Sequence, residues 1–177
     1  MAEDNKSTVH NSFWANIFNP PTEKVDLEKS LRAIPLFKSL GKRDISNLTR
    51  IIHNRNYLAG EYIFYQGDPG IGLYIIREGE VSISREGNEN DKISLATFSK
   101  GDFFGELALI DGETRSASAI ANTDARLAVI FKPDLDEFID KYPKKGIKIL
   151  VGIAHIVTVR LRTLNEEYFN LQNESKN

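Results

Sequence analysis

The spacing of apolar residues separates a central part of this chain, which has the period of β-strands, from two flanks with the period of helices. Between residues 56 and 131 apolar and polar residues alternate, and turn-forming residues recur roughly every eight to twelve positions. Short strands closed by turns such as Gly67–Gly70 are typical of an all-β barrel or jelly roll. We expect strands over residues 62–66, 73–76, 81–84, 93–98, 115–121 and 125–131, with a hairpin tip at 87–91.

The two flanks carry helical patterns. Leu27 and Leu31 share one stripe of a helix over residues 22–32. After Pro133 the helical period returns, first for a short helix and then for a long one. A second N-terminal helix is indicated by Ile45, Leu48, Ile51 and Ile52. We therefore predict an α+β fold, an antiparallel β-barrel or jelly roll flanked by helices, as one domain over residues 22–172, with helices in 22–54, the barrel in 56–132 and the C-terminal helices in 134–172.

The long C-terminal helix carries two apolar stripes. One alternates steps of three and four residues, as the seam of a coiled coil does. This seam consists of Ile147, Leu150, Ala154, Val157, Leu161, Leu164, Tyr168 and Leu171. The other stripe consists of Ile149, Ile153 and Ile156. Because a helix that is apolar on two faces must bury both, we expect one stripe to pack on the barrel and the other on a second copy of the chain. In the alternative interpretation, both stripes fold back on the same monomer.

The ends of the chain are expected to lie outside the domain. Residues 1–21 are predicted to be a flexible tail and residues 173–177 a second, short one. The first tail contains an aromatic clip, Phe13–Phe18, whose apolar side chains would share faces of a single helical turn. The clip either packs on the body of the chain or docks on a partner, and the sequence leaves both interpretations open.

Composition excludes several classes of function. A chain of 177 residues with 41% hydrophobic residues can bury one ordinary core. Its net charge of -2 gives no basis for a nucleic-acid or anionic-membrane surface. It contains no cysteine, so disulfides and thiolate metal sites are excluded. No apolar run approaches the roughly 20 residues of a membrane span, and the polar N-terminus is not a secretory signal. We expect a cytoplasmic protein without a metal or cofactor.

The stretch Gly101–Ala119 contains the residues that point to a ligand. Asp102 is predicted to cap a short helix that starts near Gly105 and ends at Gly112. The first backbone NH groups of such a helix have no partner within it, and the peptide dipoles favour an anion there. Gly105 would let a ligand approach the backbone closely. This segment therefore predicts an anion site.

Two charged side chains in the same stretch extend this prediction. The guanidinium of Arg115 can hold two oxygens of one phosphate in a fixed fork. A carboxylate at Glu106 beside an anion is explained if it accepts a hydrogen bond from a donor on the same ligand, such as a sugar hydroxyl. Phosphate and ribose side by side indicate a nucleotide. In the alternative interpretation, Glu106 and Arg115 form a surface ion pair, worth about 0–1 kcal/mol, without functional meaning.

The order of these residues resembles a known family. The run Phe104–Ile110, followed by Arg115–Ala117, is similar to the phosphate-binding cassette of the cyclic nucleotide-binding domain family. This family includes the regulatory subunits of protein kinase A and the bacterial catabolite activator protein. Upstream, Tyr57–Gly70 and Leu73–Val81 resemble the barrel strands of the family. The resemblance covers residues 34–138 and implies the barrel fold with preceding helices.

The resemblance implies a role for each cassette residue. Glu106 would hold the ribose 2'-hydroxyl and Arg115 the exocyclic oxygens of the cyclic phosphate, with the Ser116 hydroxyl near that phosphate. Cyclic AMP is the favoured ligand, and cyclic GMP is the second candidate because serine at 116 fits either one. The ligand-binding residues implied in this way are Gly105, Glu106, Leu107, Ala108, Arg115, Ser116 and Ala117.

The resemblance also implies a conformational change. Leu109 would act as the switch hinge that releases or engages the helix after Pro133, and the long C-terminal helix would close over the base. The polar groups available there as a base cap are Arg160, Arg162, Thr163 and Asn165.

The sequence therefore predicts a cyclic-nucleotide sensor that signals through an unidentified protein effector or a homodimer. No helix-turn-helix, basic patch or pseudosubstrate motif is apparent, so we expect neither direct nucleic-acid binding nor kinase inhibition. Two alternatives stay open. One is a ligand-independent scaffold with the same fold. The other is an enzyme that uses the barrel as a shell, which would need a histidine cluster that His10, His53 and His155 do not suggest.

Overall fold

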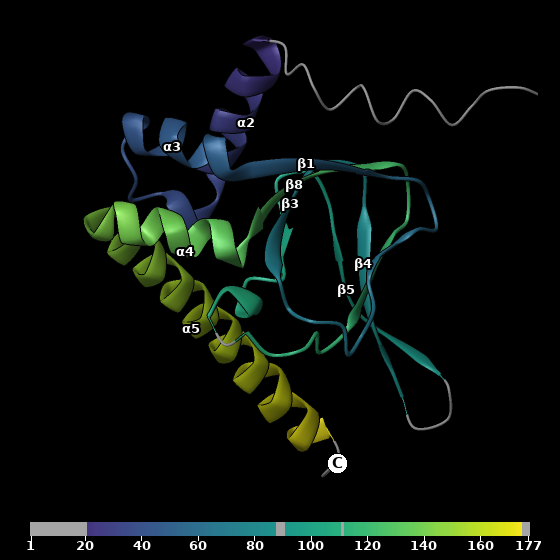
Figure 1. Ribbon diagram of the computed structural model, residues 1–177. Coiled ribbons are helices and arrows are strands. Elements are labelled where there is room, and N and C mark those ends of the chain that lie inside the picture. The colour runs from purple at the N-terminus through teal and green to yellow at the C-terminus, as the bar shows by residue number, and fades with distance from the viewer. Residues whose placement is uncertain (1–20, 88–90, 111, 175–177) are drawn as a thin grey trace, which may run out of the picture.

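The computed structural model describes residues 21–87, 91–110 and 112–174 of the 177-residue chain (Figure 1). The aromatic clip at 13–18 and part of the hairpin tip at 87–91 lie outside the described residues. Two four-stranded antiparallel sheets form the body of the molecule. In spatial order the first consists of β1 (Ile52–Tyr57), β8 (Ala125–Phe131), β3 (Gly72–Glu78) and β6 (Phe103–Phe104). The second consists of β2 (Tyr62–Phe64), β7 (Ser118–Ala121), β4 (Val81–Glu86) and β5 (Lys92–Phe98).

The described helices gather on one side of this barrel (Figure 1). Pro133 lies in the first turn of the helix after β8, where its missing NH costs nothing. Before the barrel the helices are α2 (Pro21–Ala33), the 3-10 turn η1 (Pro35–Phe37), α3 (Lys42–Leu48) and the 3-10 turn η2 (Thr49–Ile51). After it come α4 (Lys132–Lys141) and α5 (Pro143–Glu174). The α+β jelly-roll architecture predicted from the sequence is confirmed.

Several elements differ from the prediction. Ile52 was expected on a helix but begins β1, where it pairs with Ile130. Ile51 and Ile52 continue the helical spacing of the apolar residues, but both are β-branched, and β-branched residues suit an extended backbone better. The strand expected from 115 begins only at Ser118, and the short strand β6 was not predicted.

Strand β3 is buried on both faces and separates two apolar cores. Leu73 and Ile75 belong to the core between the helices and the first sheet. Tyr74 and Ile76 face the interior of the barrel. A strand covered on both sides has no polar face, which explains its continuous apolar sequence.

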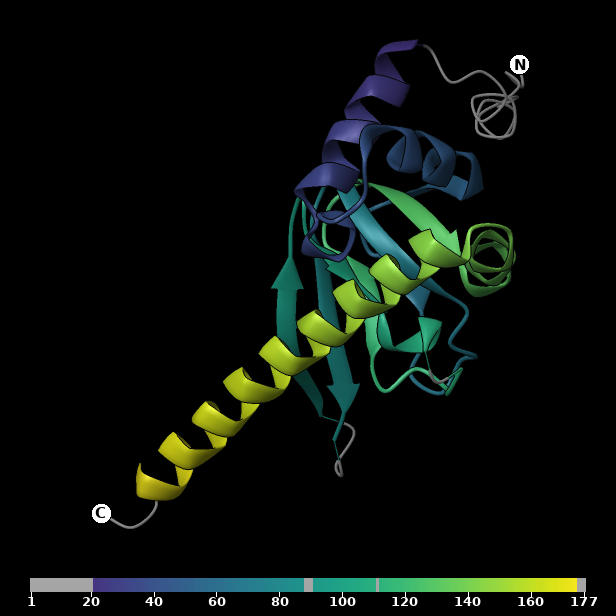
Figure 2. The same cartoon turned by 90° about the vertical axis from the view of Figure 1, so that its left-hand side faces the viewer.

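The two stripes of α5 have different environments. Ile149, Ile153 and Ile156 are buried in the core that the helices share with the first sheet. Most of the seam is exposed, and the C-terminal half of α5 extends away from the barrel (Figure 2). The exposed seam residues include Ile147, Leu150, Leu161, Leu164, Tyr168 and Leu171. The interpretation in which both stripes fold back on one monomer is therefore wrong. No helix in the described part of the chain is both long and apolar enough to span a membrane.

A glycine sets the contact between α5 and the N-terminal helices. A Cβ added to Gly152 would lie 2.3 Å from the carbonyl oxygen of Leu36 in η1. Backbone atoms at this distance leave no room for a methyl group. Gly152 therefore allows the close approach of α5 to η1.

We expect Gly152→Ala to lower the free energy of unfolding. Alanine in place of glycine improves helix propensity by about 1 kcal/mol, but pushing α5 off η1 costs roughly 1–3 kcal/mol. The net loss should be at most about 2 kcal/mol in urea unfolding. His155→Gln, at an exposed position of the same helix outside the seam, is the control and should stay within about 0.5 kcal/mol of wild type. A Gly152→Ala protein more stable than wild type would refute the packing argument.

Candidate ligand site at the mouth of the barrel

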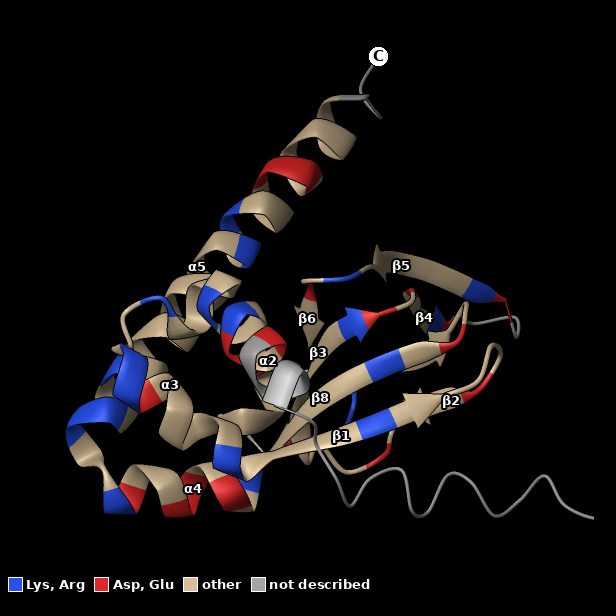
Figure 3. Cartoon of the chain, turned by 90° about the horizontal axis from the view of Figure 1, so that it is seen from above, with Lys and Arg blue, Asp and Glu red and all other residues tan. Residues whose placement is uncertain are grey.

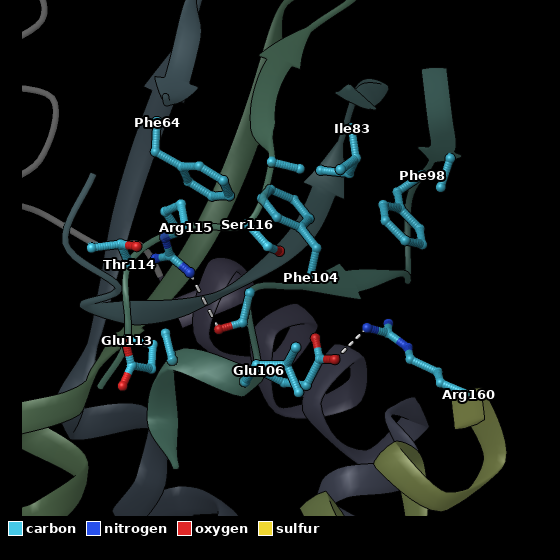
Figure 4. Close-up of a pocket in the computed structure, with 15 residues that line it drawn as sticks. Phe64, Ile83, Phe98, Phe104, Glu106, Glu113, Thr114, Arg115, Ser116 and Arg160 are labelled. Atoms are coloured by element: carbon cyan, nitrogen blue, oxygen red, sulfur yellow. Dashed lines mark hydrogen bonds and ion pairs between the residues drawn. The ribbon is translucent and has the colours of Figure 1, made fainter. Parts of the chain in front are cut away.

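A cavity of about 340 Å³ lies between the second sheet, the segment 105–117 and α5 (Figure 4). This volume falls within the roughly 300–1,000 Å³ of small-molecule sites. All seven residues predicted to bind ligand line it. The complete lining consists of Phe64, Ile83, Ala96, Phe98, Phe104, Gly105, Glu106, Leu107, Ala108, Glu113, Thr114, Arg115, Ser116, Ala117 and Arg160.

The segment after β6 turns more tightly than predicted. The expected helix is a single 3-10 turn, η3 (Leu107–Leu109), which ends before Gly112. Asp102 does not cap it, because its carboxylate accepts a hydrogen bond from the backbone NH of Ser99 at 2.9 Å. Short acidic side chains often bond to their own local backbone in this way.

Gly105 has a specific reason to be glycine. Its φ of +78° lies in the left-handed region. A Cβ there would lie 2.8 Å from Nη1 of Arg115 and 2.9 Å from the carbonyl oxygen of Gly72. The space left by the missing side chain is thus taken by the guanidinium of Arg115.

Arg115 is buried, and it forms no ion pair with a carboxylate among the described residues. Only 6% of the residue is exposed. Its Nη2 donates to the carbonyl of Gly72 at 3.0 Å and its Nη1 to that of Gly105 at 3.4 Å, while the guanidinium lies 4.2 Å from the centre of the Phe64 ring. Its Nε has no hydrogen-bond partner among the described residues. Burial lowers the pKa of Arg115, yet arginine stays charged in proteins. The site therefore holds a desolvated cation whose direct contacts are carbonyl groups and aromatic rings. The carboxylates of Asp68 and Glu106 attract it without forming an ion pair.

Glu106 forms its ion pair with α5 instead. The residue is 1% exposed, and its carboxylate accepts a hydrogen bond from the guanidinium of Arg160. Arg160 also donates to the carbonyl of Phe103 at 3.4 Å and lies over that ring. The interpretation of Glu106 and Arg115 as a surface ion pair is wrong, because both are buried and Glu106 pairs with Arg160.

The opposite side of the cavity is apolar and largely aromatic. Phe64, Ile83 and Phe98 project into it from β2, β4 and β5 (Figure 4). Phe98 and Phe104 stack with ring centres 6.1 Å apart. Sequence reasoning missed this wall, as well as Glu113 and Thr114. The alternation of β4 and β5 could have shown which of their residues face inward, and Glu113 and Thr114 directly precede Arg115.

The residues predicted for the switch and the base cap lie in different places. Leu109 does not line the cavity but is buried in the core that also contains Leu135 and Phe138 of α4. Of the base-cap candidates, Arg160 lines the cavity. The other three are exposed on α5 and do not line it: Arg162, Thr163 and Asn165.

The described residues contain no group of three metal-binding side chains of His, Cys, Asp or Glu. His53, which was expected on a helix, lies in β1 and contacts Asp134 at 2.8 Å. This contact joins the barrel to the first turn of α4, away from the cavity lining. The geometry offers an anion and a planar apolar group a place to bind, and it offers no metal centre among these residues.

A buried cation that forms no ion pair should not stabilise the protein in the absence of ligand. We expect Arg115→Met to have a free energy of unfolding no more than about 1 kcal/mol below that of wild type, or above it. Arg77→Met is the control, since Arg77 is equally buried but has a polar side-chain partner in Asn54. The control should lose more stability in the same urea titrations. If Arg115→Met loses about 2 kcal/mol or more of its free energy of unfolding, the guanidinium stabilises the fold and the expectation is wrong.

Known proteins are similar to this chain in sequence. The family model described as "Cyclic nucleotide-binding domain" matches residues 54–142. The cyclic AMP receptor protein of Thermus thermophilus is 32% identical over 137 residues, which are 77% of this chain and 62% of the relative. The cAMP-dependent protein kinase regulatory subunit of Neurospora crassa is 33% identical over 105 residues, 59% of this chain and 26% of the relative. The chain thus spans less than two thirds of either relative.

Solved structures agree with these matches. The catabolite activator protein of Thermus thermophilus superposes with a TM-score of 0.70 at 33% identity, covering 78% of this chain and 63% of that protein. A cyclic nucleotide-binding domain from Methylobacillus flagellatus superposes with a TM-score of 0.73 at 25% identity, covering 82% of each chain. The match of the family model runs from β1 to the end of α4 and contains the cassette. The chain belongs to the cyclic nucleotide-binding domain family.

Proposed function

We propose that this chain is a cyclic AMP sensor that binds its ligand in the cavity at the mouth of the barrel and responds through α5. The observation that carries the proposal is the buried guanidinium of Arg115, which forms no ion pair among the described residues and whose Nε has no hydrogen-bond partner among them. A phosphate would supply that charge and replace weak carbonyl contacts with charge-assisted hydrogen bonds. The protein acts by binding and not by catalysis.

The other lining groups fit the rest of the ligand. The backbone of Gly105, Leu107 and Ala108 contacts the phosphate or ribose, and the Ser116 hydroxyl and Ala117 lie beside the phosphate. Glu106 accepts a hydrogen bond from the ribose 2'-hydroxyl. The base lies against the aromatic wall, for which Phe98 offers a flat surface. Each part of the nucleotide thus has a matching surface.

Cyclic AMP is favoured over cyclic GMP. Both relatives described above carry cyclic AMP in their names. Ser116 is compatible with either nucleotide, and Arg160 is the described side chain of α5 that reaches the cavity. Arg162, Thr163 and Asn165 reach the base only if the C-terminal part of α5 moves toward the barrel.

Ligand binding changes the position of α5 through Glu106. In the structure the carboxylate of Glu106 forms an ion pair with Arg160. A ribose hydroxyl that donates to Glu106 shares the carboxylate with the guanidinium of Arg160 or displaces that guanidinium. The position of α5 that is preferred with ligand therefore differs from the one preferred without it. Leu109, packed on α4, moves with the cassette and acts as the hinge.

The exposed seam of α5 is the surface through which the signal leaves. A second copy of this helix covers it in a homodimer, and a protein effector with an apolar helix covers it otherwise. Six large apolar side chains of the seam stand exposed, which is costly in a monomer. Sedimentation that shows a monomer at every concentration, with and without ligand, would contradict the homodimer.

Calorimetric titration with cyclic AMP and, separately, cyclic GMP tests the proposal. We expect saturable binding, tighter for cyclic AMP, and a loss of at least about 100-fold in affinity for Arg115→Met, since a charged hydrogen-bonded phosphate contact is removed. Arg77→Met, which changes a buried arginine outside the cavity, is the matched control and should bind as wild type does. Absence of heat with both nucleotides would favour the ligand-independent scaffold.

A further inference from the structure

The first residue of α4 makes three polar contacts to different parts of the molecule. The backbone NH of Lys132 donates to the carbonyl of Ile71, just before β3, at 2.8 Å. Its ammonium donates to the carbonyl of Leu109, the last residue of η3, at 3.1 Å. The same ammonium lies 3.4 Å from the carboxylate of Asp136, one turn along α4. Lys132 thus joins three parts of the molecule at one point, namely η3 (the cassette turn), the barrel and α4.

The hydrogen bond from the Lys132 ammonium to the Leu109 carbonyl, here called the polar strut, links η3 to α4. The Lys132 side chain is 32% exposed, so its ammonium is partly shielded from water. The carbonyl of Leu109 lies at the end of the 3-10 turn, where no further turn follows to donate a hydrogen bond to it, and a cation suits this negative end of the turn. The same ammonium lies near Asp136, one of several acidic residues on α4 (Figure 3).

The strut runs parallel to an apolar contact. The Leu109 side chain belongs to the same apolar core as Leu135 and Phe138 of α4, while its carbonyl accepts a hydrogen bond from Lys132. An apolar contact tolerates sliding because it has no preferred direction. A charge-assisted hydrogen bond fixes a distance and an angle. The polar contact therefore defines how α4 sits relative to the cassette.

We infer that Lys132 is a positioning residue that couples the phosphate-binding turn to α4, so that ligand binding and the placement of α4 and α5 depend on each other. This inference rests on the proposed function. A ligand that shifts η3 carries the Leu109 carbonyl with it, and through Lys132 it biases the first turn of α4. Coupling of this kind is reciprocal, so loss of the strut weakens ligand binding although Lys132 does not line the cavity.

The test combines calorimetry with hydrogen exchange of the full chain, with cyclic AMP as the probe. Lys132→Met keeps the aliphatic stem and removes the ammonium. We expect its affinity for cyclic AMP to fall about threefold to tenfold. We also expect the ligand-dependent slowing of amide exchange in residues 132–141, present in wild type, to be reduced. Lys132→Arg restores a cationic donor and should recover both properties in large part.

Asp136→Asn is the matched control. It removes the ion pair within α4 but leaves the donor to Leu109, so its affinity should stay within about twofold of wild type. Wild-type affinity and wild-type protection of α4 in Lys132→Met would overturn the inference, as would wild-type protein that binds cyclic AMP without any change in exchange over 132–141. Wild-type protein that binds neither nucleotide would refute the proposed function itself.

Discussion

A buried guanidinium that forms no ion pair among the described residues is the constraint on which this site depends. Arg115 lies shortly before β7 and is held by the carbonyls of Gly72 and Gly105. Gly105 must lack a side chain because the guanidinium occupies that space. Desolvation of a charge is costly unless a partner compensates it. The fold accepts this cost at the mouth of the barrel, where an anionic ligand can reach the cation.

The rest of the structure connects that cation to the helices. Strand β3 supplies the Gly72 carbonyl to the site and Leu73 and Ile75 to the core beneath the helices. The cassette turn is joined to α4 through Leu109, and Glu106 is joined to α5 through Arg160. A change at the phosphate position therefore reaches both C-terminal helices through short, directly bonded or packed steps. Gly152 anchors α5 to the N-terminal helices and so limits where it can move.

The cassette could be predicted from the sequence because its residues lie close together. Glu106 and Arg115 belong to one short segment, and their types alone indicate a nucleotide. The partners of these residues come from elsewhere. The pairing of Glu106 with Arg160 joins positions far apart in sequence, and no pattern in either segment points to the other. The predicted local structure was wrong where a side chain has another hydrogen-bond partner. The carboxylate of Asp102 accepts a hydrogen bond from the backbone NH of Ser99 instead of capping a helix. Ile52 was misplaced because helical spacing and β-branching compete there, and pairing with Ile130 decides the outcome.

The most direct test is a crystal structure of the chain with cyclic AMP. The account predicts that the guanidinium of Arg115 turns from the carbonyls of Gly72 and Gly105 to two exocyclic phosphate oxygens. It also predicts that Glu106 accepts a hydrogen bond from the ribose 2'-hydroxyl, with its contact to Arg160 altered. A nucleotide bound outside this cavity, or one bound within it while Arg115 keeps only its carbonyl partners, would contradict the account.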